Sequence, residues 1–235
     1  MNYRKSEAKE AAKAQFRGVW AAITTPFTPD DKLDEAGLRR NMRRYTDGVH
    51  VDGIFCTGTM GEFWALTKEE RKRAVEIVVE EARGKCKVIA HTGHHSPNET
   101  VDLTRHAQEA GADFAIVINP YYPWGSEDTL YQWFETVASR VDIGIWMFDT
   151  PFSGIEFSPQ LTARIARLEG VFQFGRGDGE RLEHPLHVRE PEPDETDVAL
   201  LDRPEHILQL AFHEAILPLK RAPRPHPTLP TGPFN

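Results

Sequence analysis

The chain has 235 residues, of which 40% are hydrophobic, enough for a sizeable core, so an intrinsically disordered protein is excluded. Its formal net charge of −8 and pI of about 5.7 exclude nucleic acids and anionic membranes as partners, because their phosphates would be repelled. The two cysteines fit no disulfide framework or zinc site, and the sequence shows no secretory leader or membrane-spanning stretch. A cytoplasmic protein is expected.

Residues 1–17 are charged and predict an N-terminal extension, a frayed helix ahead of the domain. Apolar runs then recur with starts 26 to 36 residues apart, which is typical of repeated strand–helix units. The predicted strands cover residues 18–27, 51–59, 87–93, 113–120, 142–150 and 170–175, with a weaker seventh at 197–202. These runs show little alternation of apolar and polar residues, which favours a parallel sheet buried on both faces.

Helix signals lie between the predicted strands. Thr67 and Glu70 predict a capping box, residues 96–99 (Ser-Pro-Asn-Glu) predict a second one, and Ser158 followed by proline predicts a third helix start. The charged run at 68–73 is expected to be a solvated helix face. No glycine-rich fingerprint follows the first strand, which disfavours a dinucleotide-binding sheet.

The pattern degrades after about residue 175. Ten of the 17 prolines follow residue 184, residues 204–217 carry the pattern of a seventh helix, and no eighth strand is found. The fold class expected is therefore α/β, a (β/α)8 TIM barrel at residues 18–217 that is incomplete at its C-terminal end. A proline-rich tail at 218–235 follows it.

Catalytic residues of such barrels lie where strands end and the following loops begin. These ends carry Thr24-Thr25-Pro26-Phe27, Gly58-Thr59-Met60-Gly61-Glu62, Pro120-Tyr121-Tyr122 and Phe148-Asp149-Thr150-Pro151. In these motifs, over roughly residues 17–183, the chain resembles the dihydrodipicolinate synthase / N-acetylneuraminate lyase family of Schiff-base-forming aldolases and lyases. The resemblance implies a TIM barrel that acts on pyruvate or a related 2-oxo acid. It also implies a homo-oligomer, a dimer or tetramer, with no cofactor.

The resemblance assigns roles to individual residues. Gly58, Thr59, Met60 and Gly61 match a loop that holds the substrate carboxylate through backbone N–H groups and hydroxyls, and Met60 replaces a frequent second threonine. Thr25 is expected to bind substrate beside this loop.

Other family roles fall on positions in later loops and strands. Tyr122, or its neighbour Tyr121, matches a catalytic tyrosine that reaches across to a neighbouring subunit. Phe148 stands where the family has its proton-relay tyrosine, and a phenyl ring cannot carry a proton. Gly175 stands where the imine-forming lysine belongs, and Arg176 cannot replace that lysine because its pKa lies above 12.

Three functions are therefore considered. The first is a lyase or aldolase that condenses or cleaves a pyruvate unit through a Schiff base, and the second is a catalytically inactive, truncated or frameshifted member of the family. The third is a metal-dependent hydrolase barrel that uses His91, His94 and His95, although the first strand lacks the His-x-His motif of such enzymes. These histidines are expected to be polar loop residues, and no metal is expected.

Overall fold

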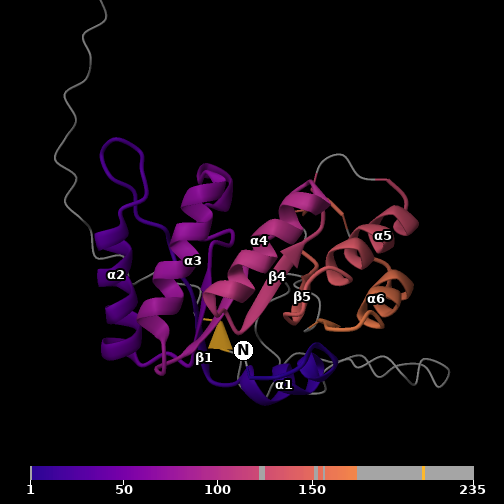
Figure 1. Ribbon diagram of the computed structural model, residues 1–235, viewed down its shortest axis with the longest axis horizontal. Helices are drawn as coiled ribbons and strands as arrows, with labels where there is room; N and C mark the ends of the chain where they lie inside the picture. The colour runs from indigo at the N-terminus through magenta and orange to yellow at the C-terminus, as the bar shows by residue number, and fades with distance from the viewer. Residues whose placement is uncertain (1, 122–124, 151–152, 156, 174–207, 210–235) are drawn as a thin grey trace, which may run out of the picture.

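The computed structural model describes residues 2–121, 125–150, 153–155, 157–173 and 208–209, drawn in colour in Figure 1. The helices are α1 Ala8–Gln15, α2 Glu35–Arg43, α3 Lys68–Ala82, α4 Pro97–Ala110, α5 Glu127–Ala138 and α6 Pro159–Ala166. The strands are β1 Val19–Ala22, β2 Gly53–Cys56, β3 Lys87–His91, β4 Phe114–Ile118, β5 Ile145–Phe148, β6 Val171–Phe172 and β7 Leu208–Gln209. Shorter turns of helix are η1 Lys5–Glu7, η2 Arg44–Val49 and η3 Phe63–Ala65. The first six predicted strands are confirmed, each shorter than its apolar run.

The strands form one sheet in the order β6-β5-β4-β3-β2-β1-β7, and every pairing is parallel. Helices α2 to α6 lie side by side along the outer face of this sheet (Figure 1). Six consecutive parallel strands with outer helices are the arrangement of an α/β barrel, as predicted. Within the described residues no pairing joins β6 to β7, so the described sheet is open.

Strand β7 departs from the sequence expectation. Residues 204–217 were predicted to form a helix, but Leu208–Gln209 pair in parallel with Val19 and Trp20 of β1. The outer edge of β1 presents unpaired N–H and C=O groups, and pairing them outweighs a local helical pattern. The predicted strand at 197–202 and the tail at 218–235 lie outside the described residues.

Side-chain caps explain where the helices begin. The Thr67 hydroxyl accepts the Glu70 N–H at 3.1 Å, and the Glu70 carboxylate accepts the Thr67 N–H at 2.9 Å, which confirms this capping box. Ser96 also caps its helix, but the Glu99 carboxylate pairs with Lys68 at 2.7 Å, so the second predicted box is wrong. A lysine on the neighbouring helix competes successfully for that carboxylate.

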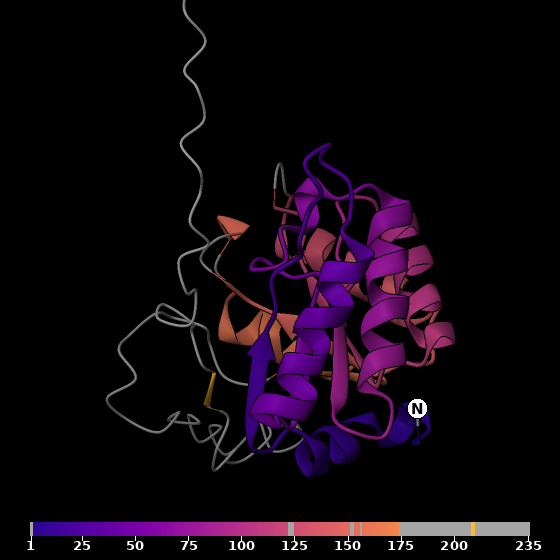
Figure 2. The same ribbon diagram turned by 90° about the vertical axis from the view of Figure 1, so that its left-hand side faces the viewer.

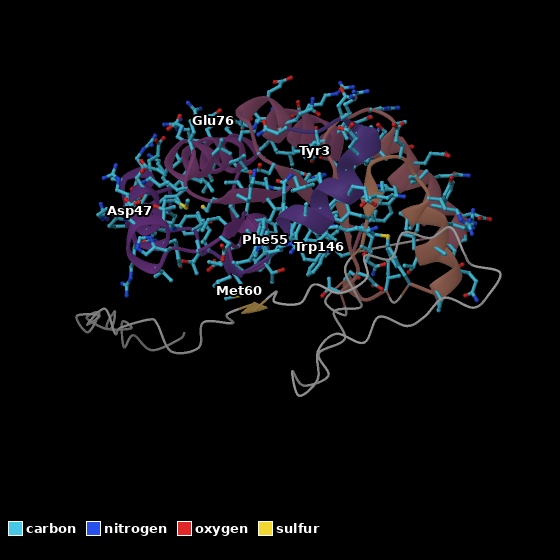
Figure 3. All side chains as sticks on the ribbon, turned by 90° about the horizontal axis from the view of Figure 1, so that it is seen from below. Tyr3, Asp47, Phe55, Met60, Glu76 and Trp146 are labelled. Carbon is cyan, nitrogen blue, oxygen red and sulfur yellow. The ribbon has the colours of Figure 1, made fainter. Side chains whose placement is uncertain are left out.

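Two apolar layers stabilise the fold. The larger one lies between the sheet and the outer helices and includes the fully buried Ile54, Ile77 and Val78. The smaller one lies inside the curve of the sheet and is rich in aromatic rings. It comprises Ala12, Phe16, Trp20, Ile89, Phe114, Ile116 and Phe172, with Tyr3, Phe55, Trp146 and Phe148 packed against it. Figure 3, seen from below, shows Phe55 and Trp146 in the middle of the molecule and Asp47 at its edge.

Helix α1 closes the amino end of this interior layer (Figures 1 and 2). Ala12 is fully buried, and the Phe16 ring stacks on Trp20 with centroids 4.6 Å apart. The Tyr3 hydroxyl donates to the Asp113 carbonyl at 2.6 Å and accepts the Gly144 N–H at 3.0 Å. The expectation of a frayed helix is therefore wrong, because small alanines allow close approach and one phenylalanine fills the interior.

Candidate active site

The turn that follows β2 carries four of the predicted substrate-binding residues. Thr57 begins it with a positive φ of 53°. The Gly61 N–H donates to the Gly58 carbonyl at 3.1 Å, and the Glu62 N–H donates to the Thr59 carbonyl at 3.1 Å. We call residues 57–62 the β2 turn.

Thr59 and Met60 lie exposed at the outer side of the β2 turn. No acceptor among the described residues takes a hydrogen bond from either N–H, and the Thr59 hydroxyl has no partner there. Two N–H groups and a hydroxyl are donors of the kind that a carboxylate needs. The geometry suits the predicted carboxylate site, which stays a prediction. The Met60 side chain, 51% exposed, adds no donor.

Thr25 and Phe55 support the same turn from neighbouring strands. The Thr25 hydroxyl donates to the Gly61 carbonyl at 2.8 Å, so the residue that follows β1 is joined directly to the turn. Gly58 lies against the Phe55 ring, where a Cβ atom would meet the ring carbon Cζ at 2.7 Å, so a larger residue at this position would displace the ring. The structure thus places Thr25, Gly58, Thr59, Met60 and Gly61 side by side, and their role in binding substrate stays a prediction.

Phe148 ends β5 at the same end of the sheet. Its half-buried ring lies 6.5 Å from that of Phe55 and 5.9 Å from that of Trp146, nearly perpendicular to both. These distances are those of edge-to-face aromatic pairs. The last residue of β5 therefore supplies an apolar ring rather than a hydroxyl.

Two other predicted site residues, Tyr122 and Gly175, lie outside the described residues. Tyr121, the alternative to Tyr122, is described. Its ring lies 3.9 Å from that of His95 and 6.1 Å from that of Phe63.

A buried polar network beneath the β2 turn was missed by the sequence analysis. Arg71 of α3 is only 5% exposed, and its guanidinium donates to the carbonyls of His91 at 3.0 Å and Gly93 at 3.2 Å. The Nδ1 atom of His91 lies 3.0 Å from the Thr57 carbonyl, and the Thr57 hydroxyl donates to the His91 carbonyl at 3.0 Å. The prediction of a solvated face over residues 68–73 is thus wrong for Arg71.

The sequence does contain a signal for this network. Arg71 is in register with the buried Ala74, Val75 and Val78, so it lies on the apolar stripe of its helix. A charged residue on such a stripe indicates a buried partner rather than a solvated side chain.

Burial sets the charge states in this network. Desolvation lowers the pKa of Arg71 to about 10, which leaves it a cation at neutral pH. Desolvation, reinforced by the Arg71 cation, lowers the pKa of His91 well below its usual value, so its ring is neutral. His91 Nδ1 lies 3.0 Å from the Thr57 carbonyl, which can only accept, and 3.4 Å from Arg71 Nη2, which can only donate. We place the His91 proton on Nδ1 because the contact with Thr57 is the shorter one.

The three histidines considered for a metal site serve other purposes. His91 is the buried last residue of β3 rather than a loop residue, and His94 Nδ1 accepts the Ser96 N–H at 3.0 Å. The His94 and His95 rings lie 6.1 Å apart. Nowhere in the described part of the chain do three His, Cys, Asp or Glu side chains converge as metal ligands. The metal-dependent hydrolase alternative gains no support.

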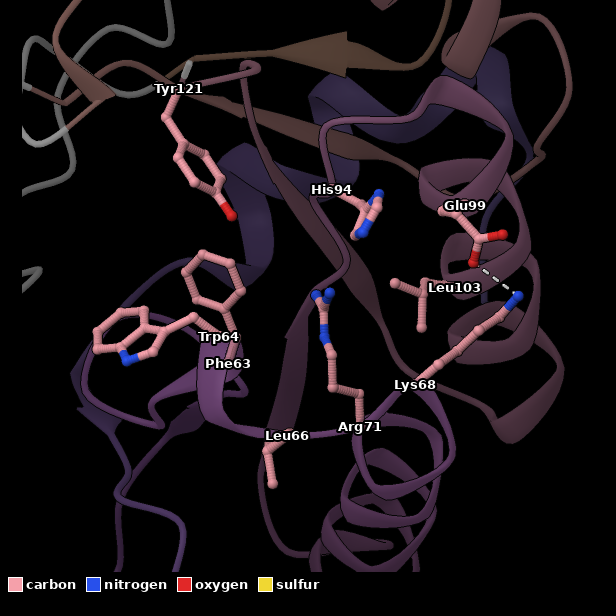
Figure 4. A pocket seen from close by; sticks show the side chains of 9 residues that line it. All are labelled: Phe63, Trp64, Leu66, Lys68, Arg71, His94, Glu99, Leu103 and Tyr121. Carbon is pink, nitrogen blue, oxygen red and sulfur yellow. Dashed lines mark ion pairs between the residues drawn. The ribbon is translucent and has the colours of Figure 1, made fainter. Parts of the chain in front are cut away.

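A pocket of about 200 Å³ lies beside the β2 turn, between η3 and the first turns of α3 and α4 (Figure 4). It is lined by Phe63, Trp64, Leu66, Lys68, Arg71, His94, Glu99, Leu103 and Tyr121. The Arg71 guanidinium lies 5.3 Å from the Phe63 ring centre, and the Lys68–Glu99 pair lies on the far side (Figure 4). Arg71 therefore lies between this pocket and the carbonyls that it binds.

The parallel strand order, the outer helices and the polar turn after β2 define a protein of the β/α-barrel class. Residues 15–189 match the model of the dihydrodipicolinate synthetase family, and the chain belongs to this family. It is 40% identical over 165 residues to a 4-hydroxy-tetrahydrodipicolinate synthase of Methanothrix thermoacetophila, covering 70% of this chain and 55% of that one. A synthase of Methanothermobacter thermautotrophicus is 32% identical over 188 residues, covering 80% and 61%. The chain thus spans less than two thirds of the length of these relatives.

Solved structures of the family show the same fold. An N-acetylneuraminate lyase from Mycoplasma synoviae is 29% identical with a TM-score of 0.65, covering 71% of this chain and 56% of that one. A chloride-inhibited dihydrodipicolinate synthase from Acinetobacter baumannii, in complex with pyruvate, is 26% identical with a TM-score of 0.66, covering 70% and 57%. Among the described residues, no helix combines the length and apolarity needed to cross a membrane.

Proposed function

We propose that this chain binds pyruvate or a related 2-oxo acid at the carboxyl ends of its strands, as a lyase or aldolase of the dihydrodipicolinate synthase type. The observation that carries the proposal is the β2 turn, whose Thr59 hydroxyl and two N–H groups have no described partner. The pyruvate complex of the Acinetobacter baumannii relative supports the choice of ligand. A homo-oligomer in the cytoplasm is proposed with it.

The chemistry proposed for this class proceeds through an imine. A lysine amine attacks the ketone carbon of the 2-oxo acid, and the carbonyl oxygen leaves as water. The iminium then accepts the electron pair of a bond at the neighbouring carbon. In condensation a C–H bond breaks there, the proton leaves, and the resulting enamine carbon attacks the carbonyl carbon of a second substrate. In cleavage the carbon–carbon bond breaks instead, the other fragment leaves as a carbonyl compound, and the enamine takes up a proton. The β2 turn would hold the carboxylate and thereby orient the ketone toward the amine.

A second candidate is a family member that binds the 2-oxo acid without reacting. The observation that favours it is Phe148, which presents a phenyl ring at the end of β5 between Phe55 and Trp146. A phenyl ring moves no proton. The sequence also has Gly175 at the position that the resemblance gives to the lysine.

Trapping with borohydride separates the two candidates. The purified full chain is incubated with pyruvate and sodium borohydride, and its intact mass is measured. A mass increase of one reduced pyruvate, located on a lysine by peptide mapping, is expected for the lyase. Pyruvate binding by calorimetry without an adduct would support the binding-only candidate, and the absence of both would overturn the proposal. Acetone, which has the ketone but no carboxylate, is the control ligand.

A further inference from the structure

Arg71 is a buried cation without an anionic partner among the described residues. Its described contacts are hydrogen bonds to the carbonyls of His91 and Gly93 and a 3.4 Å contact from Nη2 to His91 Nδ1. None goes to a carboxylate, and its Nε atom has no partner in the described part of the chain. Burying a cation without a counter-charge costs several kcal/mol, more than two hydrogen bonds to carbonyls return. Packing alone does not account for a buried cation at this cost, so its contacts indicate what it holds.

Those contacts converge on the segment that follows β3. The Arg71 guanidinium spans the carbonyls of His91 and Gly93 like a clamp. A Cβ atom at Gly93 would lie 3.0 Å from His91 Nε2 and 2.8 Å from an Ile118 methyl group, so this glycine leaves room for the imidazole. The His91 backbone is therefore held by Arg71, and its ring fits against Gly93.

His91 in turn holds the first residue of the β2 turn. Its Nδ1–H donates to the Thr57 carbonyl at 3.0 Å, while the Thr57 hydroxyl donates back to the His91 carbonyl at 3.0 Å. Thr57 is a β-branched residue with a φ of 53°, a backbone conformation that costs about 1–3 kcal/mol. This strain persists only because the surrounding bonds hold the residue in place.

Phe63 fixes the other end of the turn to the same two side chains. Its ring lies 4.4 Å from the His91 ring and 5.3 Å from the Arg71 guanidinium carbon. Its N–H donates to the Gly58 carbonyl at 3.4 Å. Thr57 at the start of the β2 turn is thus hydrogen-bonded to His91, and Phe63 directly after the turn contacts both His91 and Arg71.

We propose that Arg71 and His91 are positioning residues that set the conformation of the β2 turn and, through it, the affinity for the carboxylate of a 2-oxo acid. The second half of this inference rests on the proposed function. Neither side chain is among the exposed donors of the turn, so both act through Thr57 and Phe63 rather than on the ligand.

The variants that test the inference lie on α3 and at the end of β3. Arg71→Gln removes the clamp, and Arg71→Lys keeps the charge but cannot span two carbonyls. Arg73→Gln is the control, because Arg73 pairs with Glu35 and Glu76 on the exposed face of α3. His91→Asn keeps a donor near the Nδ1 position, whereas His91→Leu removes it.

Two measurements test the inference in the full chain. The first is the amide NMR spectrum of the β2 turn without ligand, in which Arg71→Gln, Arg71→Lys and His91→Leu should shift the Thr59 and Met60 signals. Arg73→Gln and His91→Asn should leave these signals near their wild-type positions. The second is pyruvate affinity, which should fall about tenfold in Arg71→Lys and His91→Leu.

The outcomes separate this inference from the proposed function. Unmoved turn signals in Arg71→Lys and His91→Leu would overturn it, even if both variants unfold at lower urea concentration, because the network would then be purely structural. If the wild-type chain binds no pyruvate, the proposed function fails, and moved signals still support the positioning of the turn. Moved signals with unchanged pyruvate affinity would overturn the link between the turn and the carboxylate.

Discussion

The two ends of the barrel differ in the chemistry of their buried side chains. At the amino end, α1 closes the interior with Ala12 and Phe16, and the rings of Trp20 and Phe114 lie directly against Phe16. At the carboxyl end, a buried arginine and a buried neutral histidine hold a strained polar turn. Burial of apolar surface at the aromatic end stabilises the folded chain. Desolvation of the polar and charged groups at the other end destabilises it.

This difference teaches how the fold divides its tasks. Apolar contacts are non-directional, so the amino end can be stable without an exact arrangement of atoms. Hydrogen bonds are directional, and buried ones fix the atoms that they join. Changes at the amino end should therefore affect stability, and changes at the carboxyl end should affect the β2 turn and its ligand.

The largest expected effect is at the amino end. Phe16 is 3% exposed and contacts Trp20, Phe114 and Phe172. Phe16→Ala leaves a cavity and should lower the free energy of unfolding by about 3–5 kcal/mol, as measured by urea denaturation. Val49→Ala, at a position 47% exposed, is the control and should change it by less than about 0.5 kcal/mol. A loss below about 1 kcal/mol for Phe16→Ala would show that α1 does not close the interior.

A smaller effect is expected at the carboxyl end as pH falls. The pKa of His91 in the folded chain lies well below 6.5, so the unfolded chain binds more protons beneath that pH. The contribution of His91 is fully present above pH 6.5 and is lost as pH falls from 6.5 toward the folded pKa. The loss amounts to at most about 1.4 kcal/mol per pH unit.

The comparison of wild type with His91→Asn isolates this effect, because asparagine does not titrate. Urea denaturation between pH 7.5 and pH 5, a range set by the ordinary pKa of about 6.5, should show a steeper loss of stability in the wild type. Equal slopes in the two proteins would mean that folding does not lower the pKa of His91.

The smallest expected effect distinguishes the two ends by ligand affinity. Thr25→Val removes the hydrogen bond to the Gly61 carbonyl, and Tyr3→Phe removes the hydroxyl shared by Asp113 and Gly144. Each variant should lose about 1 kcal/mol of stability. Only Thr25→Val should also weaken pyruvate binding, by about threefold in calorimetry. If both variants bind pyruvate equally well, Thr25 does not contribute to the binding site.

The strand–helix repeat could be predicted from the sequence because buried parallel strands are nearly continuous apolar runs. The caps at Thr67 and Ser158 could be predicted because they depend on neighbouring residues alone. The packing of α1 and the β1–β7 pairing could not, because both depend on partners far away in the sequence.

The candidate site shows the same limit. The β2 turn could be found because the glycines and threonine of its motif are consecutive. Arg71, Thr57 and His91 lie on three separate elements, and of the three only Arg71 stands out in the sequence, as a charge on an apolar helix stripe. Their common role follows only from the way α3 packs on the sheet.

Helix α1 has a consequence for the order in which the molecule forms during synthesis. Tyr3 and Gly144 are 141 residues apart, and the Lys9 ammonium binds the Ala166 carbonyl across 157 residues. This segment leaves the ribosome long before its partners, and contacts between such distant residues form slowly. Phe16 can stack on Trp20 as soon as both have emerged, whereas the bonds of Tyr3 to Gly144 and of Lys9 to Ala166 can form only after most of the described chain has been made.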